Sequence, residues 1–321
     1  MLVRAENTVL PLFLLMTCVG NCASSPDTRL LRLVPPESVI VAGIHAGSKP
    51  GMPGNFLMVS RSNRIDMDDF LSLTGSDASR IIYEAVFCGD SVSDSIKEHS
   101  LLVSGVFGRA AIFKYADGAR ASLQQYRGIA VMVVPPLARE RRYFTDLRWL
   151  AIPDSNIAIF GTVPSVRAEL DRYLDHSHTG AALAERVGHL NGKADSWSMV
   201  GIPLPGQHLQ RIFGPLDAGF GADLKGGGIF EFGIEFGDRQ VTLQYELAPA
   251  SEPASSDIAA SSEDAESSGA PAMKSAFLAH SNDPHTGETV RGTLKISRHR
   301  YEEWLMKKTA AGSAGETASR Q

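Results

Sequence analysis

The chain has 321 residues, of which 43% are apolar, 7% aromatic and 21% charged, and its formal net charge at pH 7 is −5. This composition excludes a wholly disordered chain, a collagen repeat and a disulfide scaffold, and the lack of a basic excess argues against a nucleic-acid partner. The length corresponds to one large or two ordinary domains.

The first segment has the pattern of an export signal. Residues 9–20 form an uninterrupted apolar run of 12 behind Arg4, which is shorter than the ~20 residues that a membrane-spanning helix needs. Small residues and then Pro26 follow the run. We therefore predict a signal peptide or lipoprotein leader over residues 1–23, and an exported protein that is periplasmic or anchored to the membrane by lipid.

Two routes of processing remain open. The stretch Val19–Cys22 resembles a bacterial lipobox, whose cysteine becomes lipid-modified and N-terminal, although Asn21 stands where Gly, Ala or Ser is usual. Cleavage by an ordinary signal peptidase near Ala23 or Ser24 is the alternative. Cys22 is therefore a candidate lipidation site that would make the N-terminus a membrane tether. Cys88 is expected to be a buried strand residue.

The mature chain alternates between strand-like and helix-like stretches. An interior strand is expected over residues 38–44, then a Gly/Pro-rich loop over 45–54 and a helix from Asp66 to Leu73, with Asp69 at the capping-box position. Further strands are expected near residues 84–88, 100–106, 121–125, 129–134, 146–152, 157–160, 197–202, 230–236, 240–247 and 289–296. Further helices are expected near residues 108–116, from Pro164, over Leu183–Leu190, and around Tyr301, Trp304 and Leu305.

Three pairs of these strands are separated by turn residues and are predicted to be hairpins. The turns lie at Tyr126-Arg127-Gly128, at residues 153–156 and at Gly237-Asp238. In the last hairpin, the alternating pattern places a set of large apolar side chains on one face: Phe230, Phe232, Ile234 and Phe236.

Hairpins interleaved irregularly with helices predict an α+β fold, with a largely antiparallel sheet and helices packed on one face. The segment Val41–Ile44 (Val-Ala-Gly-Ile) recurs as Met199–Ile202 (Met-Val-Gly-Ile) at an offset of 158 residues. This faint repeat leaves open an architecture of two similar halves.

The domain organisation follows from composition. The α+β domain is expected over residues 30–248, with a boundary near 190 if there are two subdomains. Residues 249–271 are rich in Ser, Ala and acidic side chains, which predicts a disordered insertion whose removal leaves the fold intact. A strand and a helix within 274–308 would complete the fold before a disordered tail over 309–321.

No residue is predicted to be catalytic or to bind a cofactor. The segment Gly188–Lys193 has one residue too few between its glycines for a P-loop, and Ala194 replaces the metal-binding hydroxyl. The Gly226–Gly228 run precedes a strand, whereas a dinucleotide site needs a helix there. Ser104 ends a strand, and no Gly-x-Ser-x-Gly elbow occurs in the chain.

No metal site is predicted either. Asp175, His176 and His178 are expected at a solvated helix end, because histidines two apart do not share a helix face. His280, Asp283 and His285 are expected in a polar turn. The carboxylates Asp66, Asp68 and Asp69 are expected to stabilise a helix start, and the basic run Arg139–Arg142 is expected to be an exposed loop.

Three segments together resemble an uncharacterised family of exported bacterial proteins that open with a strand of this type: Leu33–Ile44, Gln125–Gly128 and Leu150–Arg167. The resemblance spans most of the mature chain. It implies an exported α+β protein and transfers no catalytic residue, because its motifs are strand and turn signatures.

Three functions are consistent with these features. The leading hypothesis is an exported noncatalytic protein, a protein-interaction or scaffold module whose partner is an unidentified envelope protein or component. The alternatives are a small-molecule-binding exported protein and a hydrolase of unrecognised type. A cavity of several hundred cubic ångströms would favour the former, and a nucleophile, a base and oxyanion donors within hydrogen-bond reach would favour the latter.

Overall fold

The computed structural model describes the chain from residue 27 to residue 304 in ten separate ranges: 27–45, 61–74, 82–90, 98–114, 121–135, 147–176, positions 183, 185 and 187, 194–213, 228–249 and 289–304. The predicted leader 1–23, residues 46–54 of the predicted Gly/Pro-rich loop, residues 250–271 of the predicted insertion and the predicted tail 309–321 therefore lie outside the described residues. Those predictions, and the boundary near residue 190, stay predictions.

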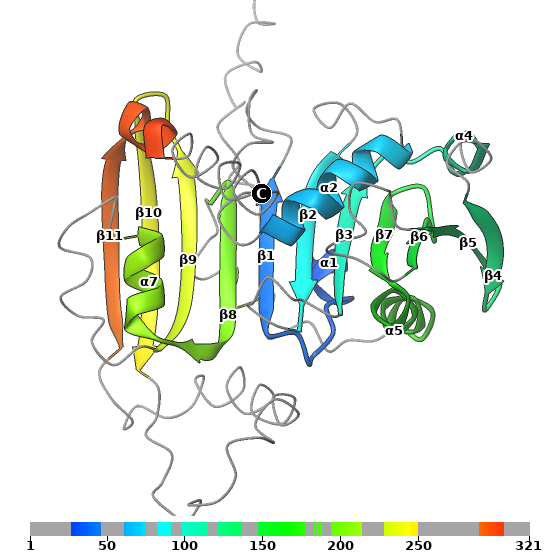
Figure 1. Cartoon of the computed structure of the whole chain (residues 1–321), viewed down its shortest axis with the longest axis horizontal. Coiled ribbons are helices and arrows are strands. Elements are labelled where there is room, and N and C mark those ends of the chain that lie inside the picture. The colour runs from blue at the N-terminus through cyan, green and yellow to red at the C-terminus, as the bar shows by residue number, and fades with distance from the viewer. Residues whose placement is uncertain are drawn as a thin grey trace, which may run out of the picture.

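The described strands form one antiparallel sheet of eleven strands (Figure 1), in the order β11-β10-β9-β8-β1-β2-β3-β7-β6-β5-β4. In chain order the strands are β1 (Ile40–His45), β2 (Ile82–Gly89), β3 (His99–Gly105), β4 (Ser122–Tyr126), β5 (Ile129–Val134), β6 (Arg148–Ala151), β7 (Ile157–Thr162), β8 (Ser196–Leu204), β9 (Gly228–Phe236), β10 (Gln240–Pro249) and β11 (Val290–Ser297). The prediction of a largely antiparallel sheet is confirmed.

The described helices are fewer than the strands. They are α1 (Thr28–Leu31), α2 (Arg61–Thr74), α4 (Arg109–Lys114), α5 (Val163–Leu174) and α7 (Gly206–Phe213), and residues 298–304 form a further helix after β11. None of the helices in the described ranges is long and apolar enough to cross a bilayer.

Helices cover both faces of the sheet, which corrects the prediction that they pack on one face. One core lies between the sheet and α2, α4, α7 and helix 298–304, through residues such as Phe70, Leu209 and Trp304. The other lies under α1 and α5, through residues such as Leu31 and Leu170. In Figure 1, α2 and α7 cross in front of the sheet and α1 lies behind it. The physical reason is that successive residues of β1 and β3 are all buried and mostly apolar, so each face needs a cover.

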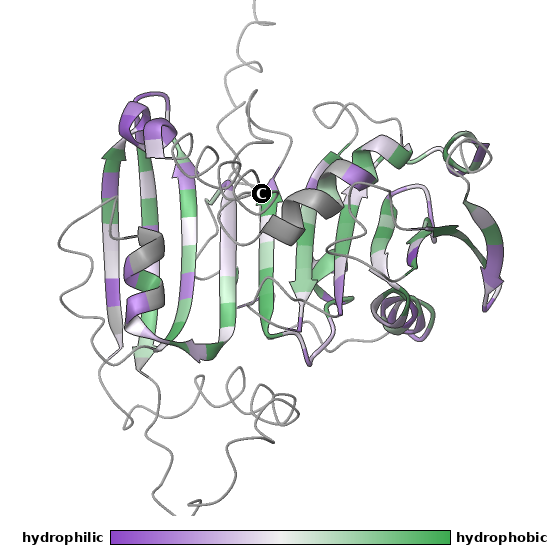
Figure 2. Ribbon diagram, in the orientation of Figure 1, coloured by the Kyte–Doolittle hydropathy of each residue, from purple (hydrophilic) through white to green (hydrophobic). Residues whose placement is uncertain are grey.

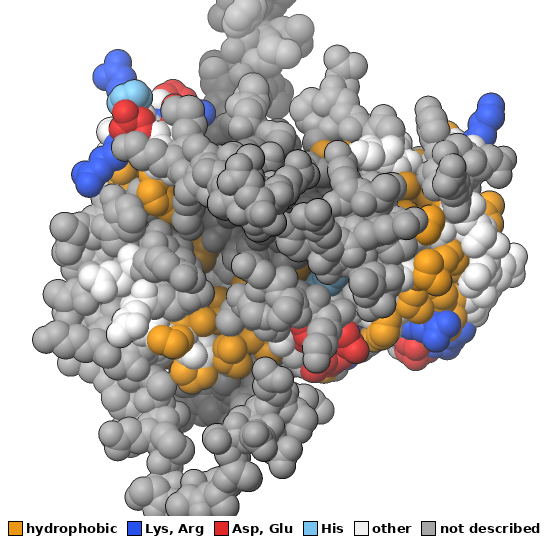
Figure 3. Space-filling view, in the orientation of Figure 1, with side chains coloured by type: hydrophobic (Ala, Val, Ile, Leu, Met, Phe, Trp, Pro, Cys, Tyr) orange, Lys and Arg blue, Asp and Glu red, His pale blue; other side chains and the backbone are white. Residues whose placement is uncertain are grey.

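The strands β9–β11 differ because only one of their faces is apolar. Phe230, Phe232, Ile234 and Phe236 all join the core beneath α7 and helix 298–304, as the alternating pattern predicts. The opposite face carries cross-strand rows of polar residues, for example Glu246 beside Arg291. In Figure 2, β11 is purple along part of its length whereas β1 is mainly green. Figure 3 shows charged side chains gathered over helix 298–304.

The repeated tetrapeptides lie side by side at the centre of the sheet. Val41 of β1 and Met199 of β8, the first residues of the two segments, are partners in the antiparallel register. From this pair, β1-β2-β3 runs outward on one side and β8-β9-β10 on the other. Both segments thus belong to one continuous sheet. Duplication stays an interpretation of that arrangement.

The three predicted hairpins are confirmed by the strand pairings β4–β5, β6–β7 and β9–β10. The first turn is of the primed type, because Arg127 has φ 48° and Gly128 has φ 85°. One helix differs from its prediction: α2 begins at Arg61 and not at Asp66. Pro249, the first residue of the predicted insertion, is the last residue of β10, and β10 pairs directly with β11.

Candidate functional site

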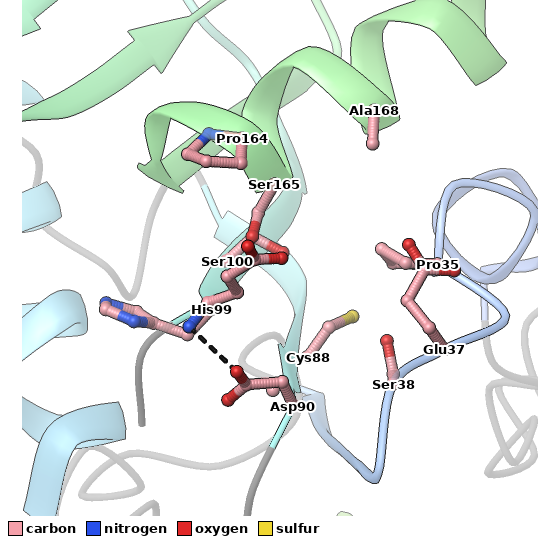
Figure 4. A pocket seen from close by; sticks show the side chains of 12 residues that line it. Pro35, Glu37, Ser38, Cys88, Asp90, His99, Ser100, Pro164, Ser165 and Ala168 are labelled. Carbon is pink, nitrogen blue, oxygen red and sulfur yellow. Dashed lines mark hydrogen bonds between the residues drawn. The ribbon is translucent and has the colours of Figure 1, made fainter. Parts of the chain in front are cut away.

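A small pocket lies at one end of β2 and β3, between the sheet and α5 (Figure 4). Its walls are the 35–38 segment, residues 88–90 and 98–100, and Pro164, Ser165 and Ala168 from the first two turns of α5. Its volume is about 40 Å³. That space holds a few water molecules at most, and binding sites for small molecules are roughly 300–1,000 Å³.

A buried polar cluster lies beside this pocket. Ser100 of β3 donates a hydrogen bond from its hydroxyl to the carboxylate of Glu169 on α5, and both residues have no exposed surface. Cys88 of β2 is paired with Ser100 in the register. In Figure 4 the Cys88 sulfur points toward the 35–38 segment. Cys88 is 2% exposed, so the prediction of a buried strand residue is correct.

Burial controls the protonation of this cluster. Burial raises the pKa of Glu169 to about 8, although the hydrogen bond from Ser100 opposes the shift. Burial and the neighbouring Glu169 carboxylate raise the pKa of the Cys88 thiol. At neutral pH the Glu169 carboxyl is therefore mainly protonated and the thiol is not ionised. A cysteine nucleophile must be ionised and accessible to a substrate. Cys88 is neither, so the cluster is not suited to nucleophilic catalysis, and its distinctive property is a carboxyl group that keeps its proton at neutral pH.

The sequence analysis did not identify Glu169, although its position on an apolar helix face indicates a buried acid. The predicted apolar face of this helix comprised Val166, Leu170, Tyr173 and Leu174. Glu169 is three residues after Val166 and next to Leu170, so it falls on the same face. A carboxylate within an apolar helical stripe indicates a buried acid with a partner on the facing element.

A second buried polar cluster lies at the other end of the same strands. The backbone N–H of Asp27 donates to Oε2 of Glu84 at 2.5 Å, and Nδ1 of His45 is 3.7 Å from the same oxygen. Burial raises the pKa of Glu84 to about 8 and lowers the pKa of His45. Burial also acts on Asp27, but its hydrogen bonds with Arg29 hold the pKa of Asp27 below its ordinary value. This cluster fixes the chain at residue 27 onto the sheet.

The structure describes two of the residues that were considered as metal ligands, Asp175 and His176. Asp175 ends α5 and forms an ion pair with Arg127 at 2.8 Å, and His176 has a left-handed backbone with φ 51°. His178, His280, Asp283 and His285 lie outside the described residues. Within the described ranges, no three residues of the metal-ligating types come together.

Asp69, in the acidic run at residues 66–69, has a different role from the one predicted. Because α2 begins at Arg61, Asp69 lies in the helix interior and cannot cap its start. Asp69 instead forms an ion pair with Arg148 of β6, with 2.6 Å between Oδ2 and Nη2 and both side chains 1% exposed. The capping-box assignment of Asp69 is therefore wrong, since the helix extends one turn further toward the N-terminus than the sequence pattern indicates.

Other candidates lie outside the described residues: Cys22, Gly188–Lys193 and Arg139–Arg142. Gly228, the last residue of the glycine run, is the first residue of β9. Ser104 is buried in β3 and takes part in the Asp27 cluster.

Comparison with known proteins gives few matches. Neither a protein-family model nor a curated protein sequence matches the chain. Among solved structures, the chain is similar to crystal form I of the protein TP0453, with 11% identity and a TM-score of 0.46 over 87% of this chain and 96% of that one. It is also similar to crystal form III of TP0453, with 11% identity and a TM-score of 0.41 over 84% of this chain and 96% of that one.

Proposed function

We propose that the protein is an exported, noncatalytic envelope protein, tethered to the membrane through Cys22, which binds a partner protein along the free edge of its sheet. The export and the tether rest on the leader pattern of the sequence. The binding mode rests on β4, the last strand of the described sheet, which has a neighbouring strand on one side only.

The β4 edge lacks the features with which proteins usually protect an open edge. Its sequence, Ser-Leu-Gln-Gln-Tyr, has no charged residue and no proline, and four of its five residues are exposed. Leu123 is 53% exposed. The opposite edge, β11, carries exposed Arg291 and Lys295. Because charged residues discourage strand addition, β4 is the edge suited to take an extended segment of a partner as a further strand.

The two alternative functions find no specific support in the described part of the chain. The pocket at α5 has a volume of about 40 Å³, which is too small for the ligand-binding alternative. Ser100 and Glu169 lie within hydrogen-bond reach but are fully buried, so no substrate could approach the hydroxyl as hydrolysis requires.

A position-specific crosslinking experiment tests the edge. A photo-crosslinking residue at Gln124 of the full-length protein should trap a partner in native envelopes, and the same residue at Thr293 of β11 should not. Leu123→Lys should abolish the crosslinked product, whereas the matched change Thr293→Lys on the other edge should leave it unchanged. Equal products from both edges, or none from Gln124, would refute the proposed binding mode.

A further inference from the structure

Two exposed apolar residues, Tyr83 and Val106, lie at the same end of the β2–β3 pair. In the register of this pair, Ile82 is opposite Gly105 and Glu84 is opposite Ser104, so Tyr83 is the extra residue of a bulge. Bulges redirect side chains out of the regular alternation. Tyr83 is 54% exposed, and Val106, which follows β3 directly, is 53% exposed.

The chain enters the fold at this same end. Asp27 donates its backbone N–H to Glu84, the neighbour of Tyr83 in β2. Arg29 forms an ion pair with Asp27 at 2.7 Å. The next residues, Leu30 and Leu31, have no exposed surface, so residue 27 is held firmly to the sheet and cannot swing away from it.

The length of the preceding segment restricts where the membrane can be. Asp27 is five residues after Cys22. At ~3.3–3.6 Å for each extended residue, this segment spans about 18 Å at most. If Cys22 carries the lipid, Asp27 lies no further than this from the bilayer surface, and the tether holds the end of the sheet beside Tyr83 near the bilayer.

We propose that the end of the sheet formed by Tyr83, Val106, Arg29 and Arg109 contacts the lipid headgroups of the membrane to which the protein is tethered. This membrane contact adds detail to the proposed function, and it depends on the proposed lipid tether at Cys22. Tyrosine suits the headgroup region because its ring is apolar and its hydroxyl is polar. Arg29, which is 54% exposed and paired with Asp27, and the exposed Arg109, which donates to the Pro153 carbonyl oxygen, add guanidinium groups that can also bind lipid phosphates.

Fluorescence quenching tests the contact on the full chain purified from membranes. The protein is reconstituted into vesicles of phosphatidylethanolamine and phosphatidylglycerol that carry a nitroxide-labelled lipid as quencher. A fluorophore is attached to a cysteine at Tyr83 or Val106, and in matched variants at Leu123 or Leu147, which are 53% and 51% exposed. Cys88 is buried and does not react in the folded protein.

The expected result is a large loss of fluorescence at positions 83 and 106 and little loss at positions 123 and 147. Flotation of the vesicles in a density gradient tests the lipid tether separately from the contact surface. Protein that floats with the vesicles but shows equal quenching at all four positions would overturn the contact surface and leave the tether intact. Protein that stays at the bottom of the gradient would overturn the tether and this surface with it.

Discussion

At the scale of single residues, the packing at the centre of the sheet requires a glycine next to a buried tryptophan. Gly43 of β1 is opposite Trp197 of β8, and Gly233 of β9 is opposite the same tryptophan on its other side. Trp197 has no exposed surface. A Cβ atom at position 43 would collide with the Trp197 indole ring, so the small residue makes room for the large one.

Gly43→Ala should therefore destabilise the protein, by about 1–3 kcal/mol, because the indole must leave its position in a packed core. Urea unfolding followed by tryptophan fluorescence measures the change in the free energy of unfolding. Gly108→Ala is the matched control, since the nearest atom to its added Cβ is 3.8 Å away. Equal stability of the two variants would show that the indole moves without cost.

The buried carboxyl of Glu169 should make stability depend on pH. Its pKa rises from an ordinary value of 4.5 to about 8 in the folded protein. The folded state then binds a proton that the unfolded state has released, so the free energy of unfolding falls as the pH rises between these two values. The contribution is fully present below pH 4.5 and is lost above about pH 8. Glu84, with a pKa of about 8, acts in the same direction.

The range from pH 6.5 to 8 is the best place to measure the contribution of the buried carboxyls. The pKa of His45 is lowered from 6.5, so its own, opposite effect on the free energy of unfolding occurs below pH 6.5. Glu169→Gln keeps an acceptor for Ser100 and removes the ionisable group. Its free energy of unfolding should fall less steeply across this window than that of the wild type, where each group contributes up to ~1.4 kcal/mol per pH unit. The exposed variant Glu235→Gln should keep the wild-type slope. An unchanged slope in Glu169→Gln would mean that Glu169 is ionised in the folded protein.

At the scale of elements, the ion pair between Asp69 and Arg148 attaches α2 to the sheet. The Arg148 guanidinium also lies 5.0 Å from the centre of the Phe160 ring, and Phe70, next to Asp69, packs against Phe107 and Phe160. Apolar contacts thus surround a fully buried charge pair. Such a pair adds little net stability, but breaking it leaves an uncompensated charge in the core.

Asp69→Asn should lower the free energy of unfolding by about 3–5 kcal/mol, because it removes the negative charge that faces buried Arg148. Chemical denaturation at neutral pH measures this loss. The exposed pair Arg298–Glu302 on helix 298–304 provides the comparison, and Glu302→Gln should cost no more than ~0.5 kcal/mol. Similar losses in the two variants would mean that α2 is not held by this pair.

The sequence predicts some of these elements better than others, for physical reasons. Alternating apolar residues and a primed turn are local features, so the hairpin at Arg127-Gly128 could be placed within a residue. The start of α2 could not, because Asp66–Asp69 have the pattern of a cap and only the tertiary contact with Arg148 shows that Asp69 is buried. The contact between Glu169 and Ser100 could not be predicted either, because the two residues are 69 positions apart and no local sequence pattern connects them. Likewise, apolar residues on both sides of β1 indicate an interior strand but do not say which helices cover each face.

At the scale of the whole molecule, the two ends of the sheet have different protection. Charged residues occupy the β11 edge, whereas β4 is uncharged and exposed. One face of β9–β11 carries polar rows, whereas the central strands have a helix-covered core on both faces. The open surfaces therefore lie at the two ends of the strand order, and the β4 end is the one at which strand addition meets no charge.

The segment between β10 and β11 should be dispensable for this sheet. The two strands pair directly from Gln240 opposite Ser297 to Leu247 opposite Val290, so the register does not depend on the length of the connection. Deleting residues 251–271 shortens the connection by about half, which changes the loop-closure entropy by only ~0.6 kcal/mol. Thermal unfolding should show a melting temperature equal to that of the full chain or slightly higher. By contrast, removing all residues from 290 onward takes away buried Ile296, Tyr301 and Trp304 and should prevent folding. A deletion of 251–271 that unfolds the protein would show that this segment is part of the core, because the strand pairing itself does not require it.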